Sequence, residues 1–179
     1  MDNNGGDPQA RRLLGIRTLR KSSDTDPEFT EYYIRLPAIG KIACFDWQIP
    51  RIEQETYTYS MVEEYREPGD PVIAPAFLGH VTENGRVIGM LLEKLEGDSA
   101  SMDDMPACRK TLENFHLMNM VHGDVNRYNF IIDRSKKPVH VRLVDFEHAE
   151  PYEGSKALLE LQSLLSELAE ITGRGGSVV

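Results

Sequence analysis

The alternation of apolar and polar positions in the first third of the chain predicts two strands and a helix. Residues 31–36 and 41–47 have strand composition, and residues 38–40 suit a turn between them. A helix is predicted for residues 51–65, directly after Pro50, because proline is tolerated where the first helical amides have no partner. Its apolar positions recur at helical spacing on one face.

The middle of the chain changes to a strand pattern. Residues 76–81 and 87–92 are predicted strands, and Asn84-Gly85 between them favours a hairpin turn because both residues tolerate positive φ. Residues 97–99 are predicted to be a linker.

The last third combines helices with short apolar runs. A mostly helical segment is predicted for residues 102–120, and strands are predicted for residues 130–132 and 139–144. The chain closes with an amphipathic helix. Its apolar stripe consists of Leu158, Leu159, Leu161, Leu164, Leu165 and Leu168.

This order of elements predicts an α+β fold, because strands gather before the main helical block instead of alternating with helices. We divide the chain into a weakly ordered N-terminal extension over residues 1–28, a sheet with one helix over residues 29–96, and a helical part over residues 97–179. The segment 173–179 has the composition of a frayed tail.

Composition narrows the classes of partner. The chain has 179 residues, and 29 acidic against 20 basic residues give a net charge of −9. Nucleic acid is therefore not an expected partner, since its binding needs clustered Lys and Arg. The two cysteines, Cys44 and Cys108, indicate neither a zinc site nor a disulfide framework. Without a signal peptide or a long apolar run, we expect a soluble cytoplasmic protein with no membrane contact.

Two short segments concentrate the residues that could carry chemistry. Asp124 and Asn129 lie in a polar loop over residues 122–129, and Asp145 follows the last predicted strand. Carboxylate and amide oxygens suit Mg²⁺, which takes a few protein ligands plus water and phosphate oxygens. A further carboxylate can orient a hydroxyl or accept its proton. The alternative interpretation is a metal-free loop in which Asp and Asn cap turns.

These segments, His-Gly-Asp-Val-Asn-Arg-Tyr-Asn and Val-Asp-Phe-Glu, resemble the catalytic core of the protein-kinase-like superfamily. The His-Gly-Asp form is most similar to aminoglycoside and choline phosphotransferases and to small atypical kinases. The resemblance implies that Asp124 is the base or orienting carboxylate, that Asn129 and Asp145 hold Mg²⁺, and that Asn126 lies near the transferred phosphate. It gives His122 a structural role, with a hydrogen bond near the Asp-Phe-Glu turn.

The resemblance extends less sharply into the first half. Residues 90–97 resemble the inter-lobe hinge, where the backbone near Glu93 and Leu95 would meet adenine; a buried strand leaving the core is the alternative. The helix after Pro50 resembles the family's helix with an ion-pairing glutamate, for which Glu55 is the best match. Lys41 would be its partner, although a solvated lysine fits the sequence nearly as well. The second choices are Glu53 for the glutamate and Arg35 for the cation.

Three departures qualify the implied activity. No glycine-rich phosphate loop precedes residue 60, Glu147 replaces the flexible glycine after Asp-Phe, and only 34 residues follow Asp145. The implied fold is thus a small antiparallel sheet lobe with one helix and a truncated helical lobe. That lobe could expose part of its leucine stripe to a protein partner or a second copy.

The implied activity is Mg-ATP-dependent phosphoryl transfer to a hydroxyl, with a small molecule as the expected acceptor. Two alternatives stay open. The same scaffold could run a different acid–base reaction with Asp124 as base, or it could be a pseudokinase that only binds a ligand or a partner.

Overall fold

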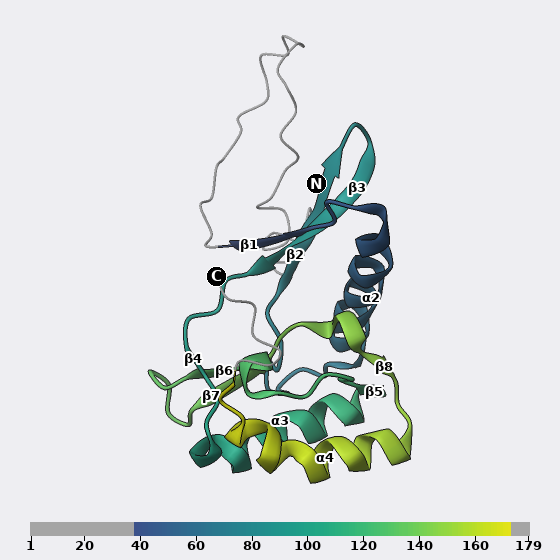
Figure 1. Ribbon diagram of the computed structural model, residues 1–179. Helices are drawn as coiled ribbons and strands as arrows, with labels where there is room; N and C mark the ends of the chain where they lie inside the picture. Colours follow the sequence, from purple (N-terminus) through teal and green to yellow (C-terminus); the bar gives the residue numbers. More distant parts are fainter. Residues whose placement is uncertain (1–37, 173–179) are drawn as a thin grey trace, which may run out of the picture.

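The computed structural model describes residues 38–172. The predicted strand 31–36, Arg35, the extension 1–28 and the tail 173–179 lie outside the described residues. Figure 1 shows the described elements in two groups, a sheet with one long helix above and two helices with short strands below. This arrangement confirms the predicted α+β class.

The upper group contains a three-stranded antiparallel sheet in the order β1-β3-β2. Its strands are β1 (Ala38–Ile42), β2 (Phe77–Glu83) and β3 (Arg86–Glu93). The predicted hairpin joins β2 to β3, and its turn residues Asn84 and Gly85 have φ values of 50° and 78°. The central strand β3 pairs with both neighbours, so it fixes the position of β1.

The prediction for β1 was wrong at both ends. Residues 38–40 belong to the strand instead of a turn, because they pair with the last residues of β3. The strand stops at Ile42, where the side chain of Gln48 accepts hydrogen bonds from the N–H groups of Cys44 and Phe45 and turns the chain. Gly89 lets β1 approach closely, since a Cβ there would lie 2.1 Å from the Lys41 carbonyl oxygen.

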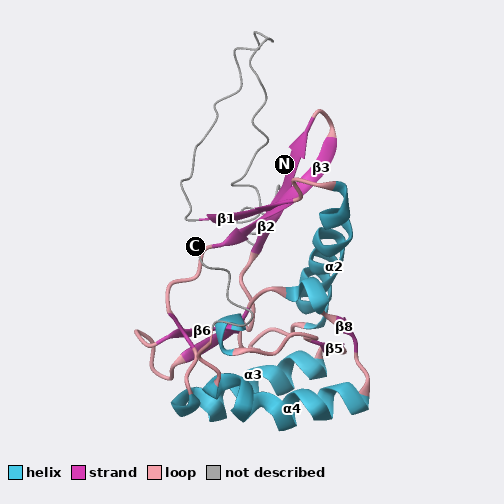
Figure 2. Cartoon of the chain, viewed as in Figure 1, coloured by secondary structure: helices cyan, strands magenta, loops and turns pink. Residues whose placement is uncertain are grey.

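Helix α2 (Ile49–Tyr65) contains the predicted helix and begins two residues earlier, with Pro50 in its first turn. It runs beside the sheet and descends toward the lower group (Figure 2). Its buried positions include Glu55, an acidic residue that needs a partner to be tolerated there.

The lower group holds the other described helices and two small antiparallel sheets, β4-β6-β7 and β5-β8. Its elements are β4 (Asp98–Ser99), α3 (Met105–Leu117), β5 (Met120–Val121), β6 (Phe130–Asp133), β7 (His140–Leu143), β8 (Glu150–Pro151) and α4 (Gly154–Ala169).

Two predictions in this half need correction. The predicted linker 97–99 contains β4, because Asp98 and Ser99 pair with β6. The helix predicted over 102–120 is shorter: its α-helical part ends at Leu117, and Asn119 at φ 64° turns the chain into β5. Position 119 ends the helix because Asn adopts the left-handed conformation at low cost.

One continuous apolar core joins the two groups. Phe115, Phe130 and Phe146 are fully buried, and the rings of Phe115 and Phe146 stack with centroids 5.1 Å apart. Tyr59 of α2 meets Phe146 edge to face, also at 5.1 Å. The upper helix is therefore packed onto the residue that directly follows Asp145.

The leucine stripe of α4 is divided between core and solvent. Leu164 and Leu168 are buried, whereas Leu158, Leu159 and Leu165 are exposed. Within residues 38–172, none of the helices has the length and apolar character needed to cross a membrane.

Candidate functional site

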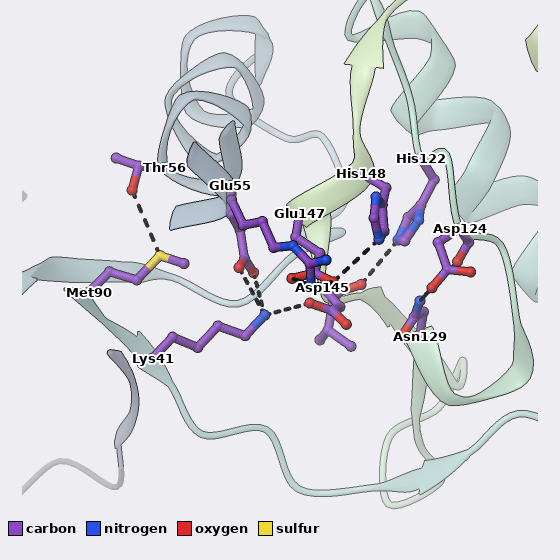
Figure 3. A network of polar contacts seen from close by, with 12 residues as sticks. Lys41, Glu55, Thr56, Met90, His122, Asp124, Asn129, Asp145, Glu147 and His148 are labelled. Atoms are coloured by element: carbon purple, nitrogen blue, oxygen red, sulfur yellow. Dashed lines mark hydrogen bonds and ion pairs between the residues drawn. The ribbon is translucent and has the colours of Figure 1, made fainter. Parts of the chain in front are cut away.

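Lys41 joins the two groups through a pair of carboxylates. Its Nζ lies 2.8 Å from Glu55 Oε2 and 2.5 Å from Asp145 Oδ1. Lys41 comes from β1, Glu55 from α2, and Asp145 from the turn after β7 (Figure 3). The ion pair predicted between Lys41 and Glu55 is thus present, and it extends to the carboxylate that the resemblance assigns to the metal.

Electrostatics keep this lysine charged. Burial alone would lower the pKa of Lys41, but the Glu55 and Asp145 carboxylates outweigh it, so its pKa lies above the ordinary value. Burial raises the pKa of Glu55, and the Lys41 ammonium acts in the opposite direction. The result is a positive charge held between two acids.

Asp145 has a backbone conformation that few residues adopt. Its φ of 65° and ψ of 66° lie in the left-handed region, where a residue with a side chain is strained. The residues before and after Asp145 are fixed by the surrounding structure, which maintains this strained conformation. The N–H of Val144 donates to the carbonyl of Asn129 at 3.0 Å, and Phe146 is buried in the core. Asp145 is therefore fixed beside the polar loop instead of moving with a free turn.

Two carboxamides orient Asp124. The side-chain nitrogens of Asn126 and Asn129 lie 3.1 Å and 3.2 Å from Asp124 Oδ2, and both also donate to the Asp124 carbonyl. Asn126 and Asn129 are nearly fully buried. In Figure 3, Asp124 and Asn129 lie on one side of Asp145, and Lys41 and Glu55 lie on the other.

The donor set fits a hard cation that also binds phosphate. Asn129 uses its amide nitrogen on Asp124, so its carboxamide oxygen can serve a cation, and Asp145 can offer Oδ2 because Oδ1 faces Lys41. Within residues 38–172, no group of three or more His, Cys, Asp or Glu side chains could hold a metal alone. Mg²⁺ commonly uses only one or two protein carboxylates and takes its remaining ligands from water and substrate oxygens.

His122 is part of the scaffold of this site. It is fully buried, and its Nε2–H donates to the Val144 carbonyl at 3.0 Å, next to Asp145, as the sequence predicted. Complete burial lowers the pKa of His122, so the ring is neutral. Its ring also contacts Phe146, with centroids 5.5 Å apart.

Glu93 is the last residue of β3, and Leu95 follows it in the segment that leaves the upper sheet. Both line a cavity of about 280 Å³ that faces β6 and β7. The N–H of Glu93 donates to the Ala76 carbonyl, and its carboxylate accepts from Arg142 Nη1 at 2.7 Å. The alternative glutamate, Glu53, lines another cavity of about 360 Å³, with Ile52 and Thr56 of the same helix. Glu55, and not Glu53, thus meets Lys41.

Glu160 of α4 anchors the polar loop from below and was missed by the sequence analysis. Its Oε1 accepts from the N–H of Gly123 at 2.7 Å, and its Oε2 lies 2.7 Å from His116 Nε2. No sequence signal identified it, because the buried face of α4, marked by Ala157 and Leu164, is known only from the packing of the helix.

Gly123 and Glu147 have roles that the motif alone did not predict. Gly123 has φ 76°, and a Cβ there would lie 2.1 Å from the His148 carbonyl oxygen. Glu147 lies in a short 3-10 helix, Phe146–His148, and its carboxylate faces Arg51 Nη1 at 3.2 Å. The negative charge that Glu147 adds after Asp-Phe is therefore paired with a cation.

No protein-family model matches the chain, and the search of curated proteins found no match either.

Proposed function

We propose that the chain is a compact kinase-like phosphotransferase that uses Mg-ATP to phosphorylate a hydroxyl group. One observation carries the proposal: Lys41 bridges Glu55 and Asp145, and Asp145 is fixed beside the loop that orients Asp124. In the proposal, three segments distant in sequence contribute the Lys41 cation, the oxygens of Asn129 and Asp145, and the oriented carboxylate of Asp124. Phosphoryl transfer needs this combination, because its catalysis is mostly positioning and charge stabilisation.

In this proposal Asp145 and the Asn129 carboxamide oxygen would hold Mg²⁺, and the ion would supply positive charge to the nucleotide phosphates. Lys41 supplies a second positive charge to the phosphates, and Glu55 keeps its ammonium aimed at them. Asn126 lies next to the transferred group, close to Asp124.

Asp124 orients the acceptor hydroxyl and receives its proton. A bond forms between the hydroxyl oxygen and the γ-phosphorus as the bond to the β–γ bridging oxygen breaks, so ADP leaves with the electron pair of that bond. Asn126 and Asn129 hold the Asp124 carboxylate in one orientation, which limits the reorganisation needed during transfer. We propose that the hydroxyl group that accepts the phosphoryl group belongs to a small molecule.

A thermal-shift titration with ATP, ADP and GTP, each with and without Mg²⁺, tests nucleotide binding. Selective binding raises the unfolding midpoint by mass action. We expect a magnesium-dependent shift for the wild type, none for Asp145→Asn, and an unchanged shift for the matched control Asp103→Asn. Asp103 is exposed at the start of the helical part, away from the site.

Turnover separates the three functions under consideration. Phosphorylated product from a panel of hydroxyl compounds, lost in Asp124→Asn while the nucleotide shift persists, supports the proposal. Turnover without nucleotide would favour a different acid–base reaction, and nucleotide binding without any turnover would favour a binding module. No magnesium-dependent shift in the wild type would refute the proposal.

A further inference from the structure

The first turns of α2 contact the segment that follows Asp145 through two polar side chains. Arg51 Nη1 lies 3.2 Å from Glu147 Oε1, and Gln54 Nε2 donates to the Ala149 carbonyl at 2.6 Å. Both contacts join residues almost a hundred positions apart in the sequence. Neither was indicated by the motifs.

These contacts lie on the same helix face as Glu55. Residues spaced three and four apart on a helix are neighbours on its surface, which places Arg51, Gln54 and Glu55 together. One turn further along, Tyr59 packs edge to face on the Phe146 ring. The position of this face relative to residues 146–149 therefore sets whether Glu55 can reach Lys41.

We propose that Arg51, Gln54 and Glu147 are positioning residues that hold α2 in the orientation required for nucleotide binding. They act through Glu55, which they keep within reach of Lys41. The effect on nucleotide binding rests on the proposed function. The claim that these residues hold α2 in place can be tested without nucleotide. It also assigns a role to Glu147, which stands where the related motif has glycine.

The two contacts differ in how much they are expected to stabilise the position of α2. The Arg51 side chain is 59% exposed, and exposed ion pairs contribute little because water and salt screen them. The hydrogen bond from Gln54 is partly buried, so its loss leaves the Ala149 carbonyl without that partner. We therefore expect the hydrogen bond of Gln54 to stabilise the position of α2 more than the ion pair between Arg51 and Glu147 does.

Hydrogen–deuterium exchange of the α2 amides, measured without nucleotide, tests the mechanical claim. In Gln54→Leu we expect the amides of residues 53–58 to exchange about fivefold faster than in the wild type, the change expected for losing one such hydrogen bond. Arg66→Ala is the matched control, because Arg66 pairs with Glu63 on the same helix and contacts neither Glu147 nor Ala149. Unchanged exchange in Gln54→Leu would overturn the inference.

A charge exchange tests the Arg51–Glu147 pair without removing core contacts. Arg51→Glu and Glu147→Arg each create a like-charged pair and should speed exchange in α2. The double variant restores an opposite-charged pair, so its exchange should return close to that of the wild type. Additive effects in the double variant would show that the pair does not act as a unit.

The affinity for Mg-ATP tests whether the contacts of Arg51 and Gln54 with residues 147–149 affect the candidate site. We expect Gln54→Leu to bind Mg-ATP about fivefold more weakly than the wild type, and Arg66→Ala to bind equally well. Faster exchange in Gln54→Leu with an unchanged affinity would refute the positioning role. If the wild type itself does not bind Mg-ATP, the proposed function fails, whereas the exchange data still decide whether these contacts hold α2 in place.

Discussion

Single residues carry much of the geometry of this site, and Gly123 is the clearest example. Its φ of 76° and its closeness to the His148 carbonyl leave no room for a side chain. The loop that presents Asp124 can therefore pass under the segment after Asp145 only if position 123 is glycine. The glycine of the His-Gly-Asp motif is thus a packing requirement of this fold.

We expect Gly123→Ala to lower the free energy of unfolding by about 3 kcal/mol or more, since it combines backbone strain with a clash against backbone. Gly69→Ala is the control, because Gly69 has φ 103° and nothing within 4 Å of the added Cβ. Denaturant titration of both variants separates strain from clash. A loss in Gly123→Ala no larger than in Gly69→Ala would show that the His148 segment yields to the methyl group.

At the scale of elements, α4 supports the polar loop through one acid. Burial alone would raise the pKa of Glu160, but the hydrogen bonds from His116 and from the backbone at Gly123 and His122 outweigh it, so the pKa is lowered. A carboxyl group with a lowered pKa in the folded state stabilises the protein above its unfolded pKa and stops doing so as the pH falls through the folded value.

We therefore expect Glu160→Gln to destabilise the protein most at neutral pH. The difference in unfolding midpoint between wild type and variant should shrink as the pH falls below about 4.3, the ordinary pKa of a glutamic acid. Thermal unfolding from pH 7 to pH 3.5 measures it, with the exposed Glu64→Gln as control. A difference that stays constant with pH would mean that the charge on Glu160 does not stabilise the loop.

At the scale of the whole molecule, the two groups of elements are joined at both ends. Lys41, Glu55 and Asp145 join them at the candidate site. Glu93 at the end of β3 and Arg142 in β7 join them at the other end, where the Glu93 carboxylate also accepts from the N–H of Ala76. The relative position of the groups thus depends on contacts on both sides of the connecting segment.

A double-mutant cycle with Glu93→Gln and Arg142→Met tests the second joint. Because both side chains are partly exposed, we expect a coupling free energy of only about 1 kcal/mol. Unfolding by denaturant measures it, and the exposed Arg109–Glu113 pair within α3 provides the comparison. A coupling near zero would indicate that the groups are held together by the apolar core and the Lys41 cluster alone.

Local sequence predicted the elements whose signals are local. The Asn84-Gly85 turn, the helix after Pro50 and the strands around the two motifs follow from turn chemistry and periodicity. It misplaced β1, because the limits of an edge strand depend on its pairing with β3 and not on its own residues. It could not divide the leucines of α4 into buried and exposed, since six leucines satisfy any orientation of that helix toward the core.

The sequence by itself determined which residues are available for chemistry: an aspartate and two asparagines at fixed spacing in one loop, and a second aspartate after a short strand. Only the tertiary structure decided which glutamate meets Lys41, that Glu160 supports the loop, and that Arg51 and Gln54 reach across to the segment after Asp145. Residues that are near in sequence are constrained by the backbone, whereas contacts between distant segments exist only after packing places the segments together. Burial of Phe146 against Tyr59 and Phe115 supplies that packing here.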